Sequence, residues 1–61
     1  MKNLVLTRKK GDSIILQRDD QELCKVTVTH VGLKQVKLAF EADSSVIIDR
    51  EEVYNLKNKI T

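Results

Sequence analysis

Alternation of apolar and polar residues marks the middle of the chain. Residues 23–31 alternate strictly, which places Cys24, Val26 and Val28 on one face of an extended strand at about residues 22–31. Residues 35–41 alternate in the same way. A sheet with one buried and one solvated face needs this period of two. The pattern therefore predicts two neighbouring antiparallel strands at about these positions.

Three other apolar runs do not alternate. They lie at about residues 3–8, 13–18 and 45–49, are apolar on both faces, and predict three further short strands. Gly11 can adopt positive φ and marks a turn between the first two. The polar stretch 18–22 predicts a hairpin loop. We therefore expect a mainly β fold of five short antiparallel strands.

A helix is expected at the C-terminal end, at about residues 50–59. Its apolar stripe has spacings of three and four and comprises Val53, Leu56 and Ile60. Asp49 is the predicted N-cap, and Glu52 three residues later would complete a capping box. The whole chain, residues 1–61, then forms one domain.

Arg50 is unexpected in this context. A cation in the first turn opposes the helix dipole, at a cost of about 0.3–1 kcal/mol. One interpretation is that Arg50 pairs with Asp49 or Glu51 in solvent. The other is that it faces an anionic or hydrogen-bonding partner.

Size favours an oligomer. A 61-residue chain buries only about 60% of its unfolded surface. Cys24 and His30 are the only cysteine and histidine, so one chain can build neither a disulfide framework nor a zinc site. So few residues cannot cover both faces of the doubly apolar strands from within. We expect a homodimer in which the outer strands are shared or packed between copies.

Charge and hydropathy limit the classes of partner that the chain is expected to bind. Lys2, Arg8, Lys9 and Lys10 place four cations and no acid in the first ten residues. Such a basic end is typical of a polyanion contact, and also of a solvated edge. No apolar run is long enough for a membrane or signal segment, and there is a single thiol. These features predict a cytoplasmic protein with no membrane partner.

The sequence gives little support for an enzyme. The sole histidine has no nucleophile and orienting partner around it, so no catalytic set is predicted. Cys24 shares the face of Val26 and Val28, which favours a buried inert thiol over a reactive one. No cofactor and no metal site are expected.

Nucleic acid is the remaining class of partner. Phe40 and Tyr54 are the only aromatic residues, and Phe40 is on the inward-facing side of its strand, so a base-stacking sheet is not expected. Recognition would instead use arginine, which can contact guanine through a bidentate fork. The unpaired backbone groups of an edge strand would add further contacts.

Two segments resemble the signature ends of the CsrA/RsmA carbon storage regulator family. These are Leu-Val-Leu-Thr-Arg-Lys-Lys-Gly at 4–11 and Val-Ile-Ile-Asp-Arg-Glu-Glu-Val-Tyr at 46–54. The resemblance implies an intertwined homodimer of chains with five strands and a C-terminal helix. It implies binding to GGA-containing mRNA leaders, and so post-transcriptional control of translation. Each of two RNA sites would combine the first strand of one copy with the fifth strand of the other.

Carried over by position, the resemblance implies a set of RNA-binding residues: Leu6, Thr7, Arg8, Lys9, Val46, Ile48 and Arg50. The chain departs from the family pattern at Asp49, where a histidine is common, and at Asp43 and Ser44, where proline and a basic residue are common. These departures indicate a divergent member. The alternative function is binding to protein, either by pairing with a standard family member or by docking a regulatory partner that acts as an antagonist.

Overall fold

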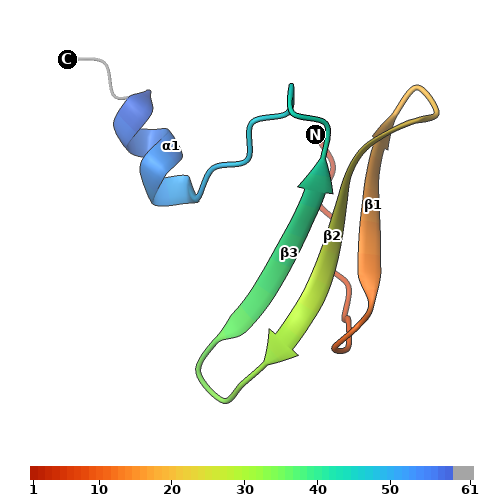
Figure 1. The fold of residues 1–61 in the computed structure, drawn as a ribbon, viewed down its shortest axis with the longest axis vertical. Coiled ribbons are helices and arrows are strands. Elements are labelled where there is room, and N and C mark those ends of the chain that lie inside the picture. Colours follow the sequence, from red (N-terminus) through yellow and green to blue (C-terminus); the bar gives the residue numbers. More distant parts are fainter. Residues whose placement is uncertain (59–61) are drawn as a thin grey trace.

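The computed structural model describes residues 1–58 and contains one antiparallel sheet followed by a helix (Figure 1). The strand order in the sheet is β1-β2-β3. The elements are β1 Ser13–Arg18, β2 Gln21–Val31, β3 Val36–Ala42 and α1 Glu51–Lys57. The protein is therefore mainly β with one C-terminal helix, as the hydropathy pattern predicts.

One face of the sheet is apolar. Val26 in β2 lies opposite Ile14 in β1 and Phe40 in β3, and residues paired in this way share a face. The register adds further residues to the same face: Leu16, Cys24, Val28, Leu38 and Ala42. Among the described residues only Cys24 and Val28 count as buried hydrophobic residues. The buried position predicted for Cys24 is confirmed.

The opposite face is mostly polar, with Ile15 as an apolar exception. The Ser13 and Thr27 hydroxyl oxygens are 2.9 Å apart and share a hydrogen bond between β1 and β2. Lys25 lies between Ile15 and Glu41 in the register. The strict alternation in residues 23–31 thus separates an apolar face from a solvated one.

Both turns around β1 depend on left-handed backbone conformations. Gly11 has φ of 91°, and beside it the Asp12 carboxylate accepts a 3.0 Å hydrogen bond from the Lys9 backbone N–H. The β1–β2 hairpin has a two-residue turn at Asp19 and Asp20, whose φ values are 54° and 62°. Two consecutive positive values are typical of a type I′ turn, which matches the twist of the strands.

The two outer segments, residues 3–8 and 45–49, are not strands in this structure, so three of the five expected strands form. A strand is stable only when its N–H and C=O groups have a hydrogen-bonding neighbour. Within residues 1–58 both β1 and β3 are edge strands, each paired on one side only. The outer segments lack a partner, and the sheet has two edges that could supply one.

The apolar face remains open in a single chain. Phe40 is 46% exposed and Leu38 is 49% exposed. Exposed patches of contiguous apolar side chains mark interaction surfaces in proteins. The expected second copy would bury this face.

The helix does not begin as predicted. Its N-cap is Arg50, which makes no side-chain capping bond, and its carbonyl accepts hydrogen bonds from the Val53 and Tyr54 N–H groups. The predicted Asp49 cap is wrong because the Asp49 carboxylate accepts a 2.9 Å hydrogen bond from Lys57 Nζ instead. Ile60, the last residue of the predicted stripe, lies outside the described residues.

Candidate nucleic-acid interface

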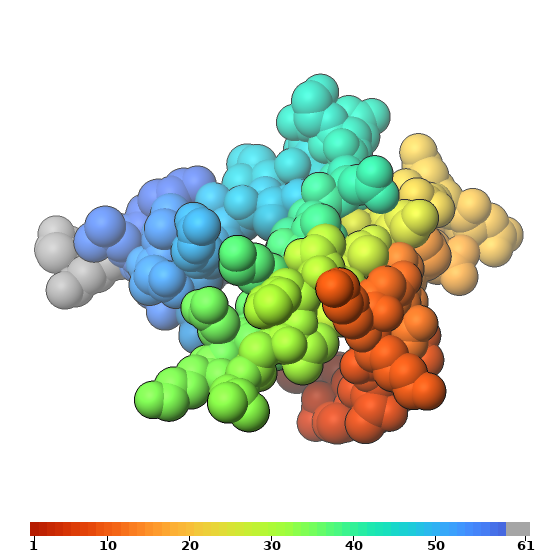
Figure 2. All heavy atoms as spheres, turned by 60° about the horizontal axis from the view of Figure 1, so that its bottom comes forward, coloured from red at the N-terminus to blue at the C-terminus, as the bar shows by residue number. Residues whose placement is uncertain are grey.

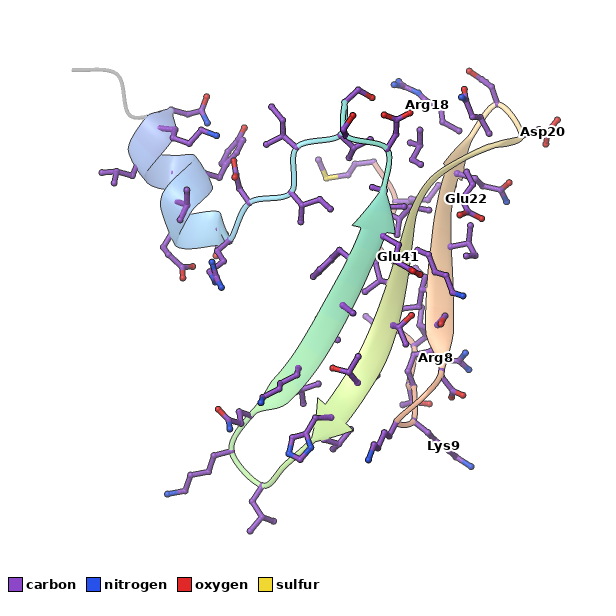
Figure 3. The ribbon with its side chains drawn as sticks, viewed as in Figure 1. Arg8, Lys9, Arg18, Asp20, Glu22 and Glu41 are labelled. Carbon is purple, nitrogen blue, oxygen red and sulfur yellow. The ribbon has the colours of Figure 1, made fainter. Side chains whose placement is uncertain are left out.

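The first group of candidate residues precedes β1. Leu6 is 43% exposed, and Thr7, Arg8 and Lys9 are exposed as well. Arg8 Nε donates to its neighbour's carbonyl, the Thr7 oxygen, at 2.8 Å, and Arg8 Nη1 lies 4.0 Å from the Asp12 carboxylate. The Lys9 side chain has no ion pair within residues 1–58. This group therefore presents two solvent-accessible cations at the turn into β1 (Figure 3).

The second group follows β3. Val46 is half-buried, and its N–H donates to the Asp43 carbonyl at 2.9 Å. The Asp43 carboxylate accepts a hydrogen bond from the Ser45 N–H at 3.0 Å, and this bond is the main cause of a lowered pKa for Asp43. The turn at 43–46 therefore sets the direction in which the chain leaves the sheet.

Beyond this turn, Ile48 and Arg50 border a hollow of about 370 Å³. Leu38 and Phe40 from the apolar sheet face contribute to its lining, as does Asp49. Arg50 thus lies at the boundary between the apolar face and the exposed chain leading to α1.

Arg50 is not neutralised locally. No ion pair links Arg50 to Asp49 or to Glu51 in the part of the chain that the structure describes. The interpretation that Arg50 merely pairs with a neighbouring acid is therefore not supported by the geometry. Its guanidinium is available to a partner.

One chain does not bring Arg8 and Lys9 to the second group. Arg8 and Lys9 lie at the start of β1, whereas residues 43–50 leave the sheet from the end of β3, at its opposite end (Figures 1 and 3). Figure 2 shows the red N-terminal segment and the blue helix on opposite sides of the molecule. A site that uses both groups would need a second copy of the chain.

Sequence reasoning missed the environment of Arg50. The hollow beside it includes Leu38 and Phe40, whose inward parity was predicted but whose proximity to Arg50 was not. The ion pair of Asp49 with Lys57 was missed too, because a capping box predicts a local partner for the carboxylate. Lys57 lies eight positions after Asp49, beyond the spacings of three and four at which helical side chains are neighbours.

The described residues contain neither a metal-binding cluster nor a membrane-spanning helix. Among residues 1–58, no group of three or more histidine, cysteine, aspartate or glutamate side chains could hold a metal ion. The one helix described, α1, is too short to cross a membrane.

Fold and site together define a small mainly β protein with exposed cations on two unpaired segments. The family described as CsrA, Global regulator protein family, matches residues 3–59, and the chain belongs to this family. Similar relatives include two proteins named Translational regulator CsrA. That of Clostridium botulinum strain Okra (Type B1) is 42% identical over 52 residues, and that of strain Kyoto (Type A2) is 40% identical over 52. Each alignment covers 85% of this chain and 67% of the relative. No solved structure matches the chain.

Proposed function

We propose that two copies of this chain form a dimer that binds single-stranded or hairpin-loop RNA containing GGA. The binding sites lie in mRNA leaders, and the dimer regulates translation in the cytoplasm. The relatives that carry the name Translational regulator CsrA support the regulatory role. The match of the family over residues 3–59 includes both candidate segments.

The open edges and the open apolar face support the dimer. Edge strands with unpaired backbone groups accept another strand readily. Segments 3–8 and 45–49 of a second copy would pair with these edges and bury side chains such as Phe40, which is 46% exposed. Each RNA site then combines residues 6–9 of one copy with Val46, Ile48 and Arg50 of the other.

The chemistry of the cations supports RNA as the ligand. An arginine can donate two hydrogen bonds to guanine O6 and N7, which a lysine cannot match in geometry. Arg8 and Arg50 are the arginines in the two segments, and Lys9 adds a charge suited to phosphate. Because the only two aromatic residues, Phe40 and Tyr54, lie outside both groups, base stacking has a small role.

A single observation carries this proposal: the Arg50 guanidinium has no ion pair within the described residues, although acids flank it on both sides. A cation at this end of the helix is disfavoured by the dipole, and within the described residues no ion pair offsets that cost. Its position is explained by a ligand.

Gel-shift binding of Arg50→Ala to a hairpin with GGA in its loop tests the proposal. We expect binding at least about tenfold weaker than wild type, equivalent to about 1.4 kcal/mol, with an unchanged melting temperature. Arg18→Ala is the matched control, because it removes an exposed arginine at the β1–β2 hairpin (Figure 3).

Equal loss of binding in both variants would indicate a general charge effect and contradict a base contact by Arg50. Unchanged binding by Arg50→Ala would contradict the RNA site itself. Binding to a protein partner, through a heterodimer or a regulatory antagonist, would then be the better hypothesis.

A further inference from the structure

The Asp49 carboxylate is next to Arg50 in sequence and lines the same hollow. Aspartate is an acceptor-only group with a full negative charge at neutral pH. Left without a partner, this charge would repel RNA phosphates and would compete for the Arg50 guanidinium. A chain that uses Arg50 to bind RNA therefore needs a way to offset Asp49.

Lys57 supplies a positive charge that offsets Asp49. Its Nζ lies 2.9 Å from Asp49 Oδ2, a distance typical of a charge-assisted hydrogen bond. Lys57 is in the last turn of α1, and helical side chains lean toward the N-terminal end of their helix. The ammonium group therefore reaches back along α1 to the residue that precedes the N-cap.

The burial of the two partners differs. The Asp49 side chain is only 20% exposed, whereas that of Lys57 is 53% exposed. The carboxylate is thus enclosed next to the hollow, while the lysine approaches it from the solvent side. Asp49 forms this pair with the distant Lys57 rather than with its neighbour Arg50, for which residues 1–58 provide no ion pair.

We propose that Lys57 is a positioning residue for RNA recognition: it holds and neutralises Asp49, which leaves the Arg50 guanidinium free for the RNA. This inference rests on the RNA-binding function proposed above. It gives a role to a lysine outside both candidate segments. It also explains how the chain carries an acid beside its principal base-contacting arginine.

A double-mutant cycle tests the coupling. Lys57→Gln exposes the Asp49 charge and should weaken binding to a GGA hairpin about threefold, in the range of exposed ion pairs. Asp49→Asn removes the charge and should bind as the wild type does. The double variant Asp49→Asn/Lys57→Gln should match Asp49→Asn, because no carboxylate remains to neutralise.

Lys34→Gln is the charge-matched control, since it removes an exposed lysine from the loop between β2 and β3. Its effect should be the same with and without Asp49→Asn. If Lys57→Gln also weakens binding threefold in the Asp49→Asn background, Lys57 acts on the RNA directly and the proposal is overturned.

A second measurement does not involve RNA. In the wild-type dimer, NMR should detect a hydrogen-bond scalar coupling between Lys57 Nζ and the Asp49 carboxylate carbon, together with slowed exchange of the ammonium protons. Both should disappear in Asp49→Asn. Fast ammonium exchange that Asp49→Asn leaves unchanged would overturn the inference whatever the RNA result. A wild-type dimer with this coupling but without preference for GGA would instead overturn the proposed function, and with it the purpose assigned to the pair.

Discussion

The sheet and the two segments that flank it differ in whether their backbone groups are paired. Strands β1, β2 and β3 pair with one another, and the turns on either side of β1 depend on Gly11 and on the Asp19–Asp20 pair. Segments 3–8 and 45–49 are as apolar as the strands and yet form none. Hydropathy therefore determines which residues can be strands, whereas the presence of a hydrogen-bonding neighbour determines which of them are.

The same contrast applies to side chains. In β2 the apolar residues Cys24 and Val28 are buried by their own chain. In the flanking segments Val5 and Ile47 are 86% and 77% exposed, and both are large aliphatic residues. Such exposure is unfavourable for a monomer, so the flanking segments would gain most from a second copy.

The largest effect is expected from truncating Phe40. This substitution tests whether the ring lies in a dimer core or on the surface of a monomer. Phe40→Ala should lower the free energy of unfolding by about 3 kcal/mol or more if a second copy buries the ring. If the ring stays half-exposed, the substitution should lower the free energy of unfolding much less. Chemical denaturation at several protein concentrations measures this difference, and the midpoint should rise with concentration.

Glu41→Ala, on the polar face of the same strand, is the control and should change stability little. A midpoint independent of concentration would contradict the dimer, and so would an equally small effect of both substitutions.

Mixed dimers sharpen the comparison further. They test whether the two flanking segments form an RNA site within one chain or between two chains. A dimer of one Arg8→Ala chain and one Arg50→Ala chain should keep one intact site and bind one GGA hairpin at wild-type strength. Each variant homodimer should bind about tenfold more weakly, as expected for loss of a bidentate contact. Binding stoichiometry from isothermal titration calorimetry gives the readout.

The complementary mixture has one wild-type chain and one Arg8→Ala/Arg50→Ala chain. Sites shared between copies leave no intact site in this dimer, whereas sites within one chain leave one. Strong binding here and weak binding in the first mixture would contradict a composite site.

A smaller effect is expected at the β1–β2 turn, which belongs to the sheet that forms within a single chain. Asp19→Asn with Asp20→Gly supplies the residue pair preferred in a type I′ turn and should stabilise the fold by about 0.5–1 kcal/mol. Thermal unfolding measures the gain. Gln17→Gly, in the neighbouring strand, is the control and should destabilise. RNA affinity should be unchanged in both, and an altered affinity would show that the flanking segments depend on the hairpin.

The smallest effect concerns acid pH and the turn at 43–46. The hydrogen bond from the Ser45 N–H lowers the pKa of Asp43, so the carboxylate is stabilised in the folded turn. Its contribution is fully present above the ordinary aspartate pKa and is lost as pH falls through the lowered one. The Ser45 amide NMR shift should titrate in that acidic range, and Asp43→Ala should abolish the titration. A Ser45 amide chemical shift that does not change with pH in the wild type would contradict the hydrogen bond.

The sequence was sufficient for the parts of the fold that depend on near neighbours. Alternation located β2 and β3, and it placed Cys24 among the buried residues. The cap at Asp49 was predicted wrongly because a local rule cannot weigh Glu52 against a lysine at the far end of the helix. Segments 3–8 and 45–49 find no hydrogen-bonding strand within residues 1–58, and the neighbour that would order them is the second copy proposed above. The contact of Phe40 and Leu38 with the hollow beside Arg50 depends on how the turn at Asp43 directs the chain, which hydropathy does not encode.

The open apolar face has a consequence for dosage. At low abundance the amount of a dimer varies with the square of the chain concentration, so doubling synthesis nearly quadruples the paired form. In the proposed monomer–dimer equilibrium, chains at low concentration would stay unpaired, with apolar side chains and strand edges accessible to proteases. If the proposed dimer is the active form, its amount would therefore respond more steeply than linearly to the rate at which the chain is synthesised.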